Sequence, residues 1–70
     1  MTVAQIAIVG SKVRVSINDA SFKGSYEGTV ISVEQDPEFL DYEVSIMQAD
    51  GKRKSLMIGD DSTDRTIEAI

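Results

Sequence analysis

Apolar and polar residues alternate along the stretch Lys12-Val13-Arg14-Val15-Ser16-Ile17-Asn18. Successive side chains of an extended chain point to opposite faces, so Val13, Val15 and Ile17 share one face. The pattern predicts a strand with one face in the core and the other in solvent. The small and polar residues that follow predict a loop, and Phe22 within it is expected to anchor the loop against the core.

A second strand is expected from about Tyr26 to Gln35. Val30, Ile31 and Val33 are all apolar, which breaks strict alternation. A bulge or strong coiling near Gly28 would let Val30 and Val33 both turn inward.

Pro37 is expected to end that strand, because proline cannot donate a hydrogen bond to a β-ladder. A third strand follows it. Tyr42, Val44 and Ile46 lie on one face of this strand, which we expect to face the core.

The pair Asp50-Gly51 stands between two alternating segments. It predicts a hairpin with a type I′ turn, whose two central residues both need a positive φ. The second arm of this hairpin is a fourth strand from Lys52 to Ile58, with Leu56 and Ile58 facing inward.

Both ends of the chain carry short apolar segments. The segment from Val3 to Val9 predicts an additional N-terminal strand. The polar segment from Gly59 to Asp64 predicts a turn or one capped helical turn. The last residues, Thr66 to Ile70, fit either a short final strand, which their β-branched side chains favour, or a second helical turn.

The chain has 70 residues, a formal net charge of −5 and no Cys, His or Trp. This length predicts one domain, residues 1–70. Without Cys there are no disulfides, zinc-thiolate sites or thiol nucleophiles, and without His the most common general base is absent. The N-terminal residues do not resemble a signal peptide, and no apolar run approaches the roughly 20 residues of a membrane span. We expect a cytoplasmic protein without membrane contact.

Five or six short strands joined by tight turns predict a small barrel or two packed sheets. The segments that carry a family resemblance are Gly10-Ser11-Lys12-Val13-Arg14-Val15, Phe22-Lys23-Gly24, Gly28-Thr29-Val30-Ile31-Ser32-Val33 and Tyr42-Glu43-Val44-Ser45-Ile46. Together they resemble SH3-like barrels of the KOW or Tudor kind, and they are similar to the family of the small stromal SH3-like subunit of photosystem I. The resemblance implies an all-β fold: a single small SH3-like barrel of five strands, with its core over about residues 10–70 and an extra N-terminal strand.

This chain departs from both families in its surface chemistry. KOW modules that bind RNA are usually basic, whereas this chain is acidic, and Tudor modules that read methylated side chains use a larger aromatic cluster. The acidity favours a non-enzymatic interaction module that docks onto a protein partner or a larger assembly. The candidate contact residues are Phe22, Tyr26, Phe39, Leu40 and Tyr42.

Phe39 and Leu40 lie in the middle of an acidic segment that runs from Glu34 to Glu43. An exposed apolar pair ringed by carboxylates would make a binding hot spot for a basic partner. The alternative, which the usual burial of Phe favours, is that Phe39 folds back onto the core.

A nucleic-acid-binding or ribonucleoprotein-binding module is the second functional interpretation. Its candidate residues are Lys12, Arg14, Lys52, Arg53 and Lys54. Strand alternation sends Arg53 to the face opposite Lys52 and Lys54, which divides the patch. The simpler reading is a set of solubilising charges that protect a strand edge.

The polar tail offers no convincing metal or catalytic site. Asp60, Ser62 and Asp64 have the first three spacings of a calcium loop, but the required Gly is replaced by Arg65. The same segment resembles a short motif of family 2 nucleotide-sugar glycosyltransferases without its Gly, and no βαβ unit precedes it, so we interpret the likeness as coincidence. We expect no catalytic residues, no metal and no cofactor.

Overall fold

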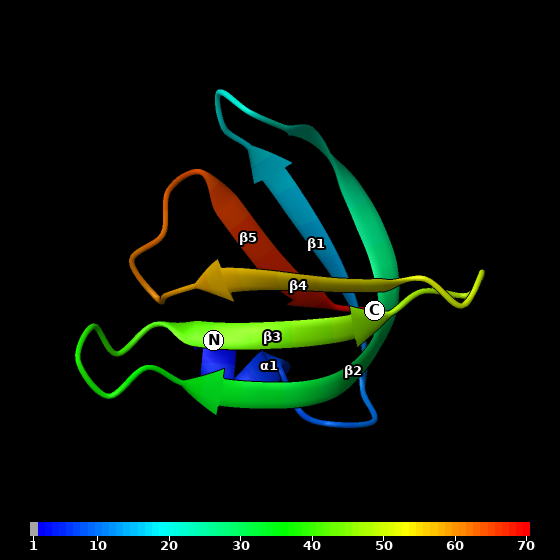
Figure 1. Ribbon diagram of the computed structural model, residues 1–70, viewed down its shortest axis with the longest axis horizontal. Helices are drawn as coiled ribbons and strands as arrows, with labels where there is room; N and C mark the ends of the chain where they lie inside the picture. The colour runs from blue at the N-terminus through cyan, green and yellow to red at the C-terminus, as the bar shows by residue number, and fades with distance from the viewer. Residues whose placement is uncertain (1) are drawn as a thin grey trace.

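The computed structural model describes residues 2–70, and its five strands form one antiparallel sheet (Figure 1). The elements are α1 (Val3–Ile6), β1 (Lys12–Asn18), β2 (Lys23–Gln35), β3 (Tyr42–Met47), β4 (Arg53–Ile58) and β5 (Arg65–Ala69). The order across the sheet is β4-β3-β2-β1-β5. The all-β prediction is confirmed, as are the bounds of the first and third predicted strands.

The long strand β2 joins the two halves of the sheet (Figure 1). Its first part pairs with β1 as far as Thr29, and its second part pairs with β3 from Thr29 onward. A Cβ atom on Gly28 would collide with the Met47 carbonyl and the Ile46 side chain, so only glycine fits at this crossing. The predicted bulge lies slightly further on, between Val30 and Ser32.

The sheet is not closed. β4 is paired only with β3, and β5 only with β1, so both are edge strands. Closure would need a ladder between β4 and β5, and none is present within residues 2–70. The expected closed barrel is therefore corrected to an open, strongly curved sheet.

The N-terminal segment is a short helix, so the predicted strand from Val3 to Val9 is wrong. Thr2 Oγ1 accepts a hydrogen bond from Gln5 N at 3.3 Å, and Gln5 Oε1 accepts one from Thr2 N at 2.8 Å, which forms a capping box. Val3 N also donates to Asp60 Oδ1 at 2.7 Å. Val3 and Ala7, four residues apart, are both buried, and α1 packs against β5.

The hairpin between β3 and β4 is confirmed, but its predicted turn type is wrong. Gly51 N donates to Gln48 O at 3.0 Å, so the central residues of the turn are Ala49 and Asp50. Gly51 has a φ of 85°, whereas Asp50 is not in the positive-φ region. A turn followed by one left-handed glycine matches the three-residue hairpin loop with a bulge.

The structure also decides between the strand and the helical turn predicted for the C-terminal segment. Residues 59–64 form a turn in which Ser62 N donates to Gly59 O, and the final segment is a strand. No helix among residues 2–70 is long and apolar enough to cross a membrane.

The core lies on the concave face of the sheet. Val13, Val15, Val44 and Ile46 have no exposed surface. The other buried apolar residues are Val3, Ala7, Val30, Leu56, Ile58 and Ile67. The inward positions predicted for the first, third and fourth strands are therefore confirmed, while Phe22 is absent from this cluster.

Candidate functional site

The loop between β2 and β3 is tied together by one carboxylate. Asp36 Oδ1 accepts hydrogen bonds from Glu38 N at 2.8 Å and Phe39 N at 3.0 Å, and these bonds lower the pKa of Asp36. Asp36 N donates to Asp41 O at 2.8 Å, and Leu40 N donates to Asp36 O at 2.9 Å. The loop is therefore held in one conformation by its own backbone.

Leu40 has a φ of 64° and is the only non-glycine residue with a positive φ within residues 2–70. A branched aliphatic residue in this region is strained by roughly 1–2 kcal/mol. Gln35 Nε2 donates to Leu40 O at 3.2 Å and helps to hold it there. The result is an apolar pair in solvent: Phe39 is 72% exposed and Leu40 62%. The expectation that Phe39 folds onto the core is wrong, because the strained turn directs the pair outward.

Carboxylates surround this apolar pair, and we call the whole feature the acidic tip. Its members are Glu34, Asp36, Glu38, Phe39, Leu40, Asp41 and Glu43. The turn after β4 adds two acidic residues nearby, because Gly59 lies against the Asp41 carboxylate and is followed by Asp60 and Asp61. None of these carboxylates takes part in an ion pair of residues 2–70. The tip therefore carries uncompensated negative charge.

A second surface, called here the aromatic groove, lies between β4 and the loop that joins β1 to β2. Tyr26 is paired with Val15 and Lys54 with Ile46, so both side chains share the concave face with the core. The Lys54 ammonium lies 5.5 Å from the centre of the Tyr26 ring and 5.9 Å from that of Phe22, a cation–π geometry. The groove encloses about 420 Å³. It is lined by Ile17, Asp19, Ser21, Phe22, Tyr26, Lys54, Ser55, Leu56, Met57 and Arg65.

Phe22 lies at the rim of the groove and does not anchor its loop in the core. It is 45% exposed. Its loop is held instead by Asp19 Oδ1, which accepts hydrogen bonds from Ser21 N and Phe22 N, each at 2.8 Å. A hydrogen bond from the Ser21 hydroxyl lowers the pKa of Asp19, and the two backbone bonds lower it further. The burial of Tyr26 raises the pKa of its phenol.

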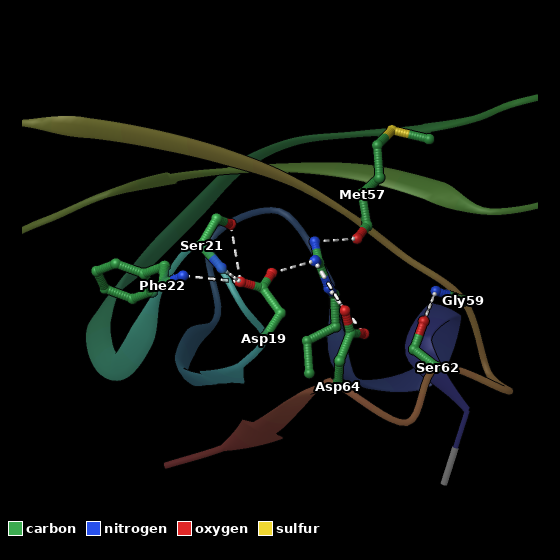
Figure 2. Close-up of polar contacts among 8 residues, drawn as sticks. Asp19, Ser21, Phe22, Met57, Gly59, Ser62 and Asp64 are labelled. Carbon is green, nitrogen blue, oxygen red and sulfur yellow. Dashed lines mark hydrogen bonds and ion pairs between the residues drawn. The ribbon is translucent and has the colours of Figure 1, made fainter.

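Arg65 on β5 contacts β4 and the loop after β1. Figure 2 labels its partners Asp19, Met57 and Asp64. From its place on β5 its guanidinium donates to the Met57 carbonyl on β4 at 3.1 Å and to Asp19 Oδ2 at 3.0 Å. It also pairs with Asp64 at 3.2 Å. One side chain thus replaces part of the missing ladder and fixes the loop that carries Phe22. Sequence reasoning missed this role; the available signal was an arginine at an inward position of the last strand.

The predicted nucleic-acid residues do not form one surface. Arg14 Nε donates to Glu27 Oε2 at 2.7 Å, and its guanidinium lies 3.5 Å from Glu68, so its charge is compensated. Lys12 lies beside Glu27 in a different groove of about 440 Å³. Lys52 is exposed in the turn before β4. Arg53 and Lys54 point to opposite faces of β4, and Arg53 Nη2 donates to Ser45 Oγ at 3.4 Å.

The predicted partner residues fall into two separate groups. Phe22 and Tyr26 belong to the aromatic groove, and Phe39 and Leu40 to the acidic tip. Tyr42 is half-buried and packs against the core.

The tail carboxylates do not converge on a common point. Asp60 accepts from Val3 N, Ser62 Oγ accepts from Gly59 N, and Asp64 accepts from Arg65. Within residues 2–70 no group of three or more acidic side chains is placed to hold a metal ion.

Comparisons with protein-family models, with curated proteins and with solved structures found no match for this chain.

Proposed function

We propose that this chain is a non-enzymatic, SH3-like protein-interaction module that contacts its partner through the acidic tip. The observation that carries the proposal is the strained backbone of Leu40 beneath an exposed apolar pair. Strain of this kind persists only where the surrounding structure enforces it, and it is concentrated at sites of function. The order of the five strands is compatible with the SH3-like fold, and the KOW or Tudor resemblance is part of the same proposal.

The hydrogen bonds around Asp36 favour binding by this loop. A loop that is already fixed loses little conformational entropy when a partner docks. Phe39 and Leu40 supply apolar area for the centre of a contact, and the surrounding carboxylates supply a polar rim. Unpaired carboxylates also favour a partner surface that carries Lys or Arg.

A photo-crosslinking amino acid placed at position 39 tests this proposal in cells that produce the protein. We expect a crosslinked protein product at position 39 and none at the exposed position 66 on β5. Excess unlabelled chain should compete with the product, whereas a Phe39→Ser variant should not. The absence of any protein product at position 39 would reject the proposed function. Recovery of RNA or DNA that survives moderate salt would support the nucleic-acid alternative instead.

A further inference from the structure

The acidic tip and the aromatic groove differ in charge. The tip and the turn after β4 carry uncompensated carboxylates. Among the residues that line the groove, Asp19 is paired with Arg65, whereas Lys54 takes part in no ion pair of residues 2–70. The groove therefore offers one unpaired positive charge that is complementary to the tip.

The two surfaces of a single chain cannot meet. In the β3–β4 register Ile58 is opposite Tyr42, next to the tip, and Lys54 is opposite Ile46. Four residues of strand separate these positions by about 13 Å, and the tip extends away from the sheet beyond Tyr42. Figure 1 shows the β2–β3 loop and the β3–β4 loop protruding from opposite sides of the molecule. Any contact between tip and groove must therefore join two chains.

We propose that the acidic tip of one copy docks into the aromatic groove of a second copy. This inference rests on the proposed function, because it names the partner of the tip as another copy of the chain. Phe39 and Leu40 of the first copy would cover the apolar part of the groove, at Phe22 and Tyr26 of the second. Glu38 and Asp41 would compensate Lys54 and its neighbours.

Chemistry selects this groove over the slightly larger one beside Lys12. The groove at Lys12 contains no aromatic residue, and its single cation lies beside Glu27. The aromatic groove combines the rings of Phe22 and Tyr26 with a cation, Lys54, that has no carboxylate partner within residues 2–70. Its volume is about 420 Å³, and it is open to solvent.

The contact is heterologous, because the tip and the groove are different surfaces. Each docking event leaves one free tip and one free groove, so association continues into a ring or an open chain. We therefore expect oligomers beyond the dimer as the protein concentration rises into the millimolar range. Sedimentation velocity measured over a wide concentration range detects this directly.

Charge reversal tests which surfaces meet. Lys54→Glu and Glu38→Lys should each raise the dissociation constant for self-association by about tenfold or more, because like charges then face each other. Lys12→Glu and Glu68→Lys make the same charge changes at exposed positions outside both surfaces and should have little effect. Denaturant unfolding of all four variants, with Lys54→Ala as a milder change, separates a lost contact from a lost fold.

Mixing the two reversed variants gives the decisive measurement. The basic tip of Glu38→Lys then meets the acidic groove of Lys54→Glu, and the two unaltered surfaces also match. Association should return in the equimolar mixture although neither variant associates alone. A wild-type chain that stays monomeric, reversed variants that associate normally, or a mixture without recovery would each overturn the inference.

The crosslinking experiment keeps the two proposals separate. A product at position 39 that joins two copies, with the attached residue near Phe22 or Lys54, supports both proposals. A product with a different protein supports the proposed function and overturns self-association.

Discussion

At the scale of single residues, Leu40 shows how a loop can hold an apolar pair in water. Its φ of 64° is possible because Asp36 and Gln35 fix the backbone on both sides. The sequence showed Phe39 and Leu40 among carboxylates but not the positive φ. Phe is usually buried, and only the hydrogen bonds of the folded loop reveal why this one is exposed.

Leu40→Gly should remove the backbone strain but also adds conformational entropy to the unfolded chain. The net result should be a rise of about 0.5–1 kcal/mol in the free energy of unfolding. Leu40→Ala is the matched control, because it removes the side chain and keeps the strain. Urea unfolding measures both. If Leu40→Gly is less stable than Leu40→Ala by the roughly 0.5–1 kcal/mol that glycine ordinarily costs, the backbone at this position is not strained.

Arg65 is the residue whose loss should affect the most distant parts of the structure. Arg65→Ala removes the hydrogen bonds to Met57 O and Asp19. It should lower the free energy of unfolding by about 2 kcal/mol. The expected loss is smaller than for a fully buried ion pair, because the pair between Arg65 and Asp19 is partly exposed. The stability of Arg65→Lys should lie between that of the wild type and that of Arg65→Ala, because a lysine cannot donate to both partners in the same geometry. Urea unfolding ranks the three proteins, and an Arg65→Lys variant as unstable as Arg65→Ala would show that charge alone contributes nothing.

At the scale of elements, most strands were predictable because alternation is a local property. The first and third strands have the bounds that their patterns indicate, and Gly51 marks the hairpin. The N-terminal helix was missed because its apolar residues also suit a strand. Its decisive contacts, the bond from Val3 N to Asp60 and the packing on β5, are long-range.

The two loop carboxylates, Asp19 and Asp36, should make stability depend on pH. Both have a folded-state pKa below the ordinary value of 3.8. Their contribution is therefore complete above that value and is lost as pH falls through the lower folded-state pKa. Asp19→Asn and Asp36→Asn retain a hydrogen-bond acceptor but cannot titrate, so each should reduce the acid-side slope of stability. Urea unfolding between neutral and strongly acidic pH measures the slope, and an unchanged slope in both variants contradicts this assignment.

At the scale of the whole molecule, the sequence predicted an all-β chain of five or six short strands but not the open edge. Whether β4 meets β5 depends on curvature accumulated over all five strands, which no local pattern records. Arg65 and Lys54 occupy inward positions on the two edge strands, and inward-pointing charges discourage further strand pairing. The candidate contact residues formed one set in the sequence, and only the fold shows that Phe22 and Tyr26 lie apart from Phe39 and Leu40.

Gly28→Ala tests the crossing at which β2 passes from one half of the sheet to the other. The added methyl group would meet the Met47 carbonyl and Ile46, so β2 and β3 must move apart. We expect a loss of about 1–3 kcal/mol in the free energy of unfolding. Gly10→Ala is the control for steric crowding, because nothing lies within 4 Å of the position of an added Cβ atom. Any loss of stability in that variant comes from the φ of 95° at Gly10. A Gly28→Ala protein as stable as the wild type would mean that the strands separate freely.

The continuity of β2 has a consequence for how the molecule melts. One half of the sheet contains β1 and β5, the other contains β3 and β4, and both depend on the same thirteen-residue strand. Neither half should unfold alone, because β2 belongs to both halves and its loss from one would disrupt the other. Heat should therefore disrupt the chain in a single cooperative step, with equal calorimetric and van't Hoff enthalpies.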